Sequence, residues 1–75
     1  MSKFTNMLKH RRLQRKMSKA DVARELGWTP MYYGRYENGY LIPTKANINK
    51  FAVFLNISES ELENIINTFS EREEH

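Results

Sequence analysis

A methionine, an arginine and an asparagine lie at residues 31, 35 and 38, four and then three residues apart. At about 100° per residue, a helix would place Met31, Arg35 and Asn38 on one face. An arginine can chelate the O6 and N7 atoms of guanine, and a methionine can pack on the methyl group of thymine. Such a face suits the reading of base edges in a DNA groove. The opposite face, which we expect to point into the domain, carries Tyr33, Tyr36 and Glu37 together with Thr29.

Gly34 stands in the middle of the same segment, where a glycine costs a helix about 1 kcal/mol relative to alanine. One explanation is that DNA or another helix approaches too closely there for any Cβ. The alternative is a tolerated substitution on an exposed face. The sequence leaves both explanations open.

Residues 18–39 have the pattern of two short helices joined by a tight turn. We predict helices over residues 19–26 and 30–38, each preceded by a hydroxyl residue that can cap its first turn. A glycine follows each predicted helix, where it can adopt the left-handed conformation that ends a helix. The residues that start and stop the two helices are Ser18 with Asp21, Gly27, Thr29 with Pro30, and Gly39. Two helices with a glycine-containing corner form the helix-turn-helix unit, which places one helix in the major groove of DNA.

Three further predicted helices, over residues 3–15, 45–55 and 59–69, complete an all-α chain. The expected caps are Thr44, Asn56, and Ser58 with Glu61. The expected core residues of these helices, and of the corners between helices, are Phe4, Leu8, Leu13, Trp28, Ile48, Phe51, Ala52, Leu55, Ile57, Leu62 and Ile65. Residues 1–69 would form one compact five-helix domain, and the charged residues 70–75 would fray.

Charge is distributed unevenly along the chain. Residues 1–24 contain eight basic residues and one acidic residue, a formal balance of +7, whereas residues 25–75 contain four basic and eight acidic residues, a balance of −4. A basic half beside an acidic half suits a polyanionic partner on one side only. Taken by itself, the basic run is equally consistent with a solvated helix that keeps the protein soluble.

Helix N-termini attract anions because their N–H groups are free and the helix dipole is positive there. The candidate contacts to DNA phosphates are Lys19 and Thr29, at two such helix starts, and Asn38 at the end of the second helix. Their position beside the helix pair is what distinguishes them from ordinary surface residues.

Composition argues against an enzyme, a metal protein and a membrane protein. The chain has 75 residues and no cysteine, so it allows one small domain without disulfides or thiolate metal sites. His10 and His75 lack neighbours that would indicate a metal site or a catalytic triad, and no glycine-rich phosphate loop is present. No apolar run approaches the roughly 20 residues of a membrane span, and we expect no leader segment. We therefore expect no cofactor and a cytoplasmic protein.

Residues along most of the chain, from Leu8 to Ile66, form an ordered set. They are Arg12, Ser18 to Ala23, Leu26-Gly27, Thr29, Tyr33, Arg35 to Gly39, Pro43, Phe51-Ala52, Leu55, Ile57-Ser58 and Leu62. In this order and spacing they resemble the phage repressor and Cro-like helix-turn-helix domains, the XRE family. The resemblance implies a compact five-helix domain whose third helix enters the major groove, usually as a two-fold dimer on a palindromic operator.

The resemblance also implies roles for individual residues. The residues that match the family's base-reading positions are Pro30, Met31, Tyr32 and Arg35, and those that match its phosphate contacts are Lys19 and Asn38. Arg12 and Glu37 match its internal ion pair between the first and third helices, which is structural. Where many relatives carry Lys or Arg after the glycine, this chain has Tyr40, Leu41 and Ile42, so we expect fewer phosphate contacts there.

These features predict a small transcription regulator, most simply a repressor that blocks polymerase as a DNA-bound homodimer. The candidate dimer surface comprises Leu41, Ile42, Ile66 and Phe69. The alternative is a helix-turn-helix module that mainly binds another protein, as an antirepressor or antitoxin-like partner, with weak DNA binding. A protein antagonist of the regulator is a further conceivable partner. The salt dependence of DNA binding distinguishes a DNA-binding regulator from a module that mainly binds another protein, since only contacts to phosphates release counterions.

Overall fold

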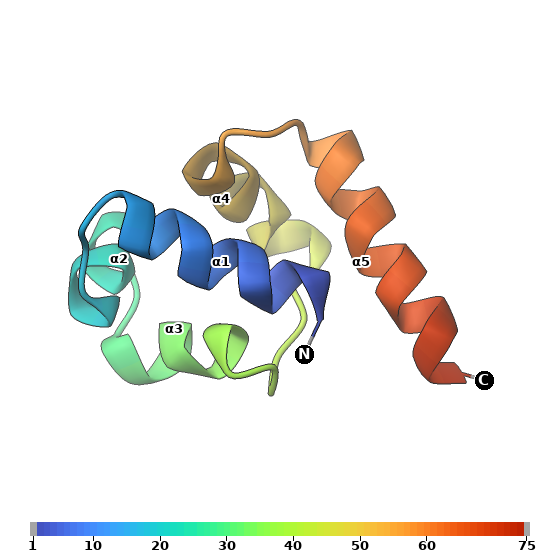
Figure 1. Ribbon diagram of the computed structural model, residues 1–75, viewed down its shortest axis with the longest axis horizontal. Coiled ribbons are helices and arrows are strands. Elements are labelled where there is room, and N and C mark those ends of the chain that lie inside the picture. The colour runs from blue at the N-terminus through green and yellow to red at the C-terminus, as the bar shows by residue number, and fades with distance from the viewer. Residues whose placement is uncertain (1, 75) are drawn as a thin grey trace.

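Helices account for most of the residues that the structure describes. The computed structural model describes residues 2–74, with side chains described for residues 2–67. Five α-helices follow one another as α1 (Lys3–Gln14), α2 (Lys19–Leu26), α3 (Pro30–Glu37), α4 (Lys45–Leu55) and α5 (Glu59–Glu74) (Figure 1). The predicted all-α fold class is confirmed, and the first four helices begin and end within one residue of their predicted bounds.

Side-chain caps determine where several helices begin. The Ser18 Oγ accepts from the Asp21 N–H at 3.1 Å and the Asp21 carboxylate accepts from the Ser18 N–H at 2.9 Å, so α2 opens with a complete capping box. The Thr29 Oγ1 accepts from the Tyr32 N–H at 3.2 Å at the start of α3. Thr44 precedes α4 as predicted but makes no side-chain cap hydrogen bond.

Left-handed residues end helices or turn the chain between them. Gly27 ends α2 with φ +81°, and Gly39 follows α3 with φ +86°. Asn56 ends α4 with φ 60°, as its side chain permits. Lys16 adopts φ 56° in the turn between α1 and α2, which the sequence does not predict because lysine is not a turn former.

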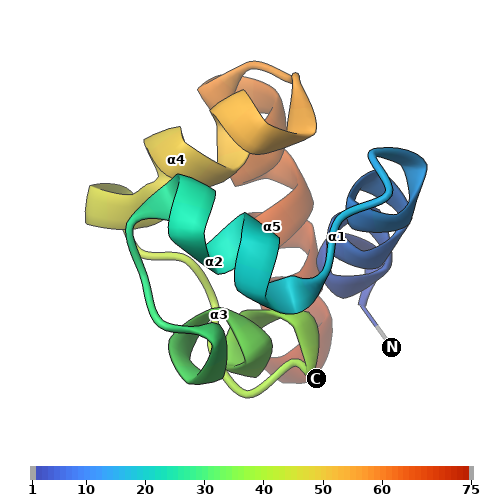
Figure 2. The same ribbon diagram turned by 90° about the vertical axis from the view of Figure 1, so that its left-hand side faces the viewer.

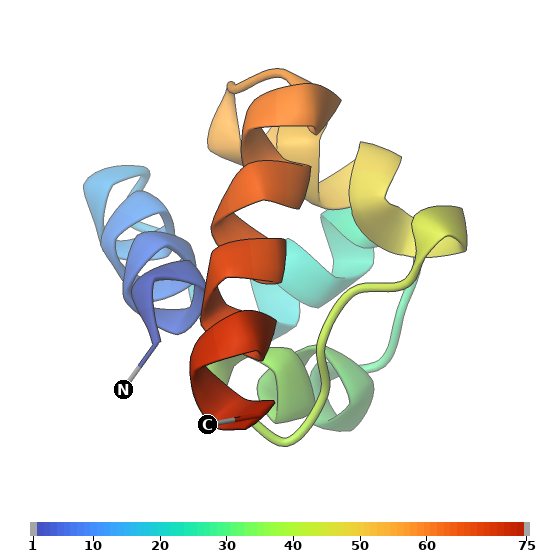
Figure 3. The same ribbon diagram turned by 90° about the vertical axis from the view of Figure 1, so that its right-hand side faces the viewer.

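The helix α5 continues to Glu74, past its predicted end at residue 69. Its C-terminal half extends away from α4, as Figures 1 and 3 show. Phe69, one of the residues expected at a dimer surface, lies outside the described side chains. Among residues 2–74, no helix is long and apolar enough to span a bilayer.

All five helices contribute to one apolar core. Its buried members are Phe4, Leu8, Val22, Ala23, Leu26, Tyr33, Tyr36, Ile48, Phe51, Ala52, Phe54, Leu55, Leu62 and Ile66. Trp28 and Ile57, which the sequence places at helix corners, are partly buried against this core.

Leu13, expected in the core, is instead 64% exposed. It lies five residues after the fully buried Leu8, and at 100° per residue that spacing turns it about 140° away from the core. Arg12, one residue earlier, takes the inward position with only 15% of its side chain exposed.

The helix α3 lies along one edge of the molecule. Figure 1 shows it below α1 and α2, and in Figure 2, turned by 90°, again no other helix lies beneath it. It contacts α2 and α1, whereas α4 and α5 pack on each other and on α1. One face of α3 is therefore held by the domain and the other is left uncovered.

Candidate nucleic-acid interface

The inward face of α3 is anchored by three buried side chains. Tyr33 and Glu37 are fully buried and Tyr36 is 2% exposed. They are the residues that helical spacing predicts to face the domain, and that prediction is confirmed. The rotation of α3 about its own axis is thus set by groups on its inner side.

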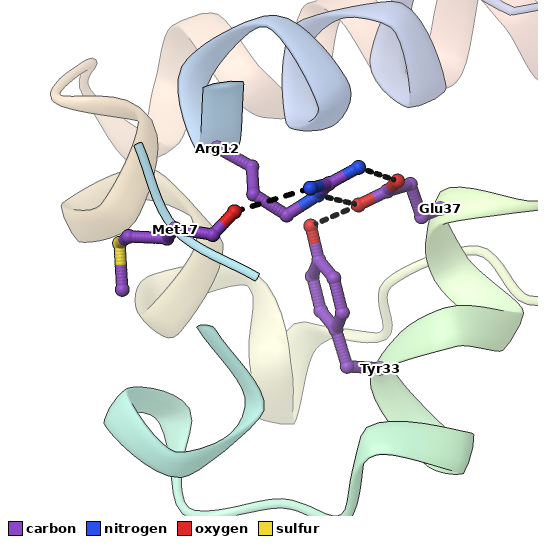
Figure 4. Close-up of polar contacts among 4 residues, drawn as sticks. All are labelled: Arg12, Met17, Tyr33 and Glu37. Carbon is purple, nitrogen blue, oxygen red and sulfur yellow. Dashed lines mark hydrogen bonds and ion pairs between the residues drawn. The ribbon is translucent and has the colours of Figure 1, made fainter. Parts of the chain in front are cut away.

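Glu37 is the centre of a buried polar network (Figure 4). The Arg12 Nε donates to Glu37 Oε2 at 3.0 Å and the Arg12 Nη2 donates to Oε1 at 2.9 Å, which makes a two-bond ion pair. The Tyr33 hydroxyl donates to Oε2 at 2.6 Å, and the Arg12 Nη1 donates to the Met17 carbonyl at 3.1 Å. The ion pair implied by the family resemblance is therefore present, and it joins α1, the turn before α2, and the end of α3.

This network shifts the titration of its members. Burial acts to raise the pKa of Glu37, but the hydrogen bonds from Arg12 and Tyr33 outweigh it and hold that pKa below its usual value. The hydrogen bond to Glu37 raises the pKa of Arg12, and burial together with the bond to Glu37 raises the pKa of Tyr33. At neutral pH the site consequently holds a charged pair and a neutral tyrosine.

The outward face of α3 carries the residues predicted to read bases. Met31 is 73% exposed, and Pro30, Arg35 and Asn38 are exposed as well. Arg35 forms no ion pair with any residue whose side chain is described. Its guanidinium therefore keeps its donors available for an acceptor outside the protein.

Tyr32 differs from the other predicted base-reading residues because it is half-buried on the flank of α3 that faces α4. Its hydroxyl lies 2.9 Å from that of Tyr36, and the Asn47 Nδ2 donates to both hydroxyls, at 3.2 and 3.1 Å. The ring of Trp28 lies edge-on to that of Tyr32, with the ring centroids 5.0 Å apart, and stacks on that of Tyr36, with the centroids 5.5 Å apart. Tyr32 thus connects α3 to α4 through Asn47.

Candidate phosphate contacts lie at the start of α2 and at the two ends of α3. Lys19 is exposed as the first residue of α2, and Asn38 is exposed just after α3. Thr29 is also exposed, so the prediction that it faces the domain is wrong. The reason is that its hydroxyl oxygen caps α3 at the helix start, and the hydroxyl proton stays available to a second acceptor.

The comparison with protein families decides what kind of domain this is. Residues 8–62, more than half of the chain and including all of α2, α3 and α4, match the family described as helix-turn-helix. The chain belongs to this family. Its type is the XRE, or Cro/CI, type, whose members are DNA-binding transcription regulators. No curated protein and no solved structure matches the chain.

In this helix-turn-helix protein the surface predicted for dimerisation is only partly exposed. Ile42 is 41% exposed and Leu41 is half-buried, beside a groove of about 490 Å³ that both residues line. Ile66, predicted to be surplus to the core, is 7% exposed, so that prediction is wrong. It lies one helical turn after the fully buried Leu62 and follows it into the core, whereas Ile65 is half-buried at the edge.

Two residues that hold the helix-turn-helix unit in place were not found from the sequence. Asn47 ties α4 to the tyrosines of α3, as described above. The Lys50 Nζ donates to the Leu26 carbonyl at 2.7 Å and lies 5.2 Å from the ring of Trp28, which secures the turn between α2 and α3. Both are polar residues on α4 whose partners lie far away in sequence, so no local pattern marks them.

Proposed function

We propose that this protein is a sequence-specific transcription regulator that inserts α3 into the major groove of DNA and represses a promoter by occupying it. The observation that carries the proposal is the uncovered outer face of α3, where Met31 is 73% exposed and Arg35 and Asn38 are exposed. Arg35 would chelate a guanine, and Met31 would pack on a thymine methyl group. Pro30, at the leading end of the same helix, would contact bases only through its apolar ring.

Phosphate contacts would hold α3 in the groove without reading sequence. Lys19, Thr29 and Asn38 are exposed near the ends of α2 and α3, which is where the sugar-phosphate walls of the groove would pass. The formal balance of +7 over residues 1–24 supports this placement, because those residues make up α1 and most of α2. The protein would accordingly act in the cytoplasm, at the nucleoid.

A homodimer on a palindromic operator would give the specificity that one short helix lacks. Its half-sites would be about 34–36 Å apart, one turn of DNA. Leu41 and Ile42 are the described residues that we propose for the dimer contact, with Ile42 41% exposed. Phe69 stays a sequence-based proposal for the same surface.

The test of base reading is selection of bound sequences from a random duplex pool with wild-type protein and with Arg35→Ala. We expect Arg35→Ala to relax the preference at one guanine position by about 1–3 kcal/mol. The matched control is Lys19→Ala, which also removes one positive charge and should weaken all sequences alike. An identical selected motif after Arg35→Ala would refute the role of that residue.

A salt series separates this function from a module that mainly binds another protein. With about six phosphate contacts, affinity for the selected duplex should fall about a thousandfold between 50 and 200 mM salt. A protein-interaction module, which the exposed part of Ile42 would favour, should show no selected motif and only weak binding to any duplex.

A further inference from the structure

Gly34 is the one glycine of this chain whose presence the fold does not explain. The chain has three glycines. Gly27 and Gly39 have φ values of +81° and +86°, a region that residues with a side chain rarely adopt. Gly34 has no such positive φ and lies in the middle of α3, where alanine is the more stable residue. Backbone conformation therefore does not require a glycine at residue 34.

Packing inside the molecule does not require it either. A Cβ placed on Gly34 would have no atom within 4 Å beyond its chain neighbours and the backbone of its own helix. At Gly27, by comparison, the same atom would come 3.6 Å from the Lys50 Nζ, and at Gly39 it would come 3.8 Å from the Thr5 Cγ2. The sequence allows either DNA or another helix as a close neighbour of Gly34. Among the described residues, no other helix comes that close.

Gly34 borders the face of α3 that we propose to read bases. Residues three and four apart are neighbours on a helix surface, so Gly34 lies between Met31 and Asn38, and Arg35 follows it directly. Those three residues are exposed. A side chain at residue 34 would stand beside them, at the border of that face.

We infer that DNA packs against the backbone of α3 at Gly34, and that the missing side chain sets how deeply the helix enters the groove. The inference rests on the proposed function. Glycine allows a ligand to approach the backbone more closely than any other residue does. With that approach, Met31 and Arg35 reach the base edges, whereas a Cβ at residue 34 holds the helix away from them.

The test is a pair of substitutions that should move stability and affinity in opposite directions. Gly34→Ala should raise the midpoint of thermal unfolding by roughly 4–8 °C, because it favours the helix and meets no neighbour. It should weaken binding to the selected duplex by about 5- to 150-fold, the range for one added methyl in a close-packed contact. Gly34→Gln carries a longer side chain at the same position, whose Cβ meets no neighbour in the free protein; it should fold as well as the wild type and bind more weakly than Gly34→Ala.

The matched control is Asn64→Ala, at an exposed position on α5, which improves helix propensity in the same way away from α3. It should leave DNA affinity unchanged. Binding of Gly34→Ala within twofold of the wild type, or Gly34→Gln binding no more weakly than Gly34→Ala, would overturn the inference and leave the proposed function standing. A wild-type protein without salt-dependent duplex binding would overturn both.

Sedimentation of the same variants distinguishes DNA from a second copy of the chain as the neighbour of Gly34. The inference expects wild type and Gly34→Ala to have the same mass free in solution and the same stoichiometry on the duplex. A loss of affinity that accompanies a loss of dimer would place a second protein chain at Gly34 and would overturn the inference.

Discussion

The replacement of Glu37 by alanine should destabilise the domain strongly while leaving the base preference of folded molecules unchanged. Glu37 is fully buried and the Arg12 side chain is only 15% exposed, so the substitution leaves a nearly buried guanidinium without its carboxylate. It also removes the acceptor of the buried Tyr33 hydroxyl, a hydrogen bond of 2.6 Å.

The magnitude follows from that geometry. Removal of one partner of a buried pair costs about 3–5 kcal/mol. A domain of this length has a total stability of about 4–11 kcal/mol, at 0.05–0.15 kcal/mol per residue. Each kcal/mol is worth about 4–8 °C in a small domain, so the midpoint should fall by at least about 12 °C.

The assay is thermal unfolding followed by circular dichroism, combined with duplex selection at a temperature where the variant is still folded. The matched control is Glu25→Ala. Glu25 also accepts two bonds from one arginine, at 3.0 and 3.2 Å from Arg15, but these side chains are 45% and 35% exposed. That variant should lose less than about 1 kcal/mol. An unchanged midpoint for Glu37→Ala, or equal losses for the two variants, would refute the reasoning, as would an altered selected motif.

Three further predictions follow from contacts away from the proposed base-reading face. The pKa of Glu37 is lower in the folded than in the unfolded chain, so its contribution to folding stability is complete above the unfolded value, near 4.5, and is lost as the pH falls through the folded value. The midpoint of thermal unfolding of the wild type should therefore decrease as the pH drops below about 4.5, and that of Glu37→Gln should decrease less over the same interval. Tyr32→Phe removes the hydroxyl that accepts from Asn47 and should lower the midpoint by roughly 4–8 °C, about 1 kcal/mol; an unchanged midpoint would show that this link to α4 contributes nothing. Leu13→Ser should stay within about 0.5 kcal/mol of wild type in denaturant unfolding, whereas Leu8→Ala should lose about 2–5 kcal/mol, and equal losses would contradict the exposure of Leu13.

Helix positions were predictable because their signals are local. The Ser18–Asp21 capping box, the left-handed Gly27 and the Thr29 cap each involve residues at most three apart, and each is present in the structure. The inward face of α3 was predictable for the same reason, since helical spacing alone places Tyr33, Tyr36 and Glu37 together.

Contacts between distant residues were predictable only where a family pattern supplied them. The Arg12–Glu37 pair joins residues 25 apart and came from the resemblance. The Lys50–Leu26 bond spans 24 residues, and Lys50 does not belong to that family pattern. The two errors in the core could have been avoided by stricter use of helical spacing: Leu13 lies about 140° from Leu8 around α1 and is exposed, whereas Ile66 lies one turn after Leu62 in the middle of α5 and is buried.

The division of α3 into an anchored inner face and an unattached outer face has a consequence for evolution. Met31, Arg35 and Asn38 are exposed, and substitutions at such positions usually change stability by no more than about 0.5 kcal/mol. New side chains there can arise without any compensating repair of the interior. Variants of this scaffold could in this way acquire new target sites while unfolding at the same temperature.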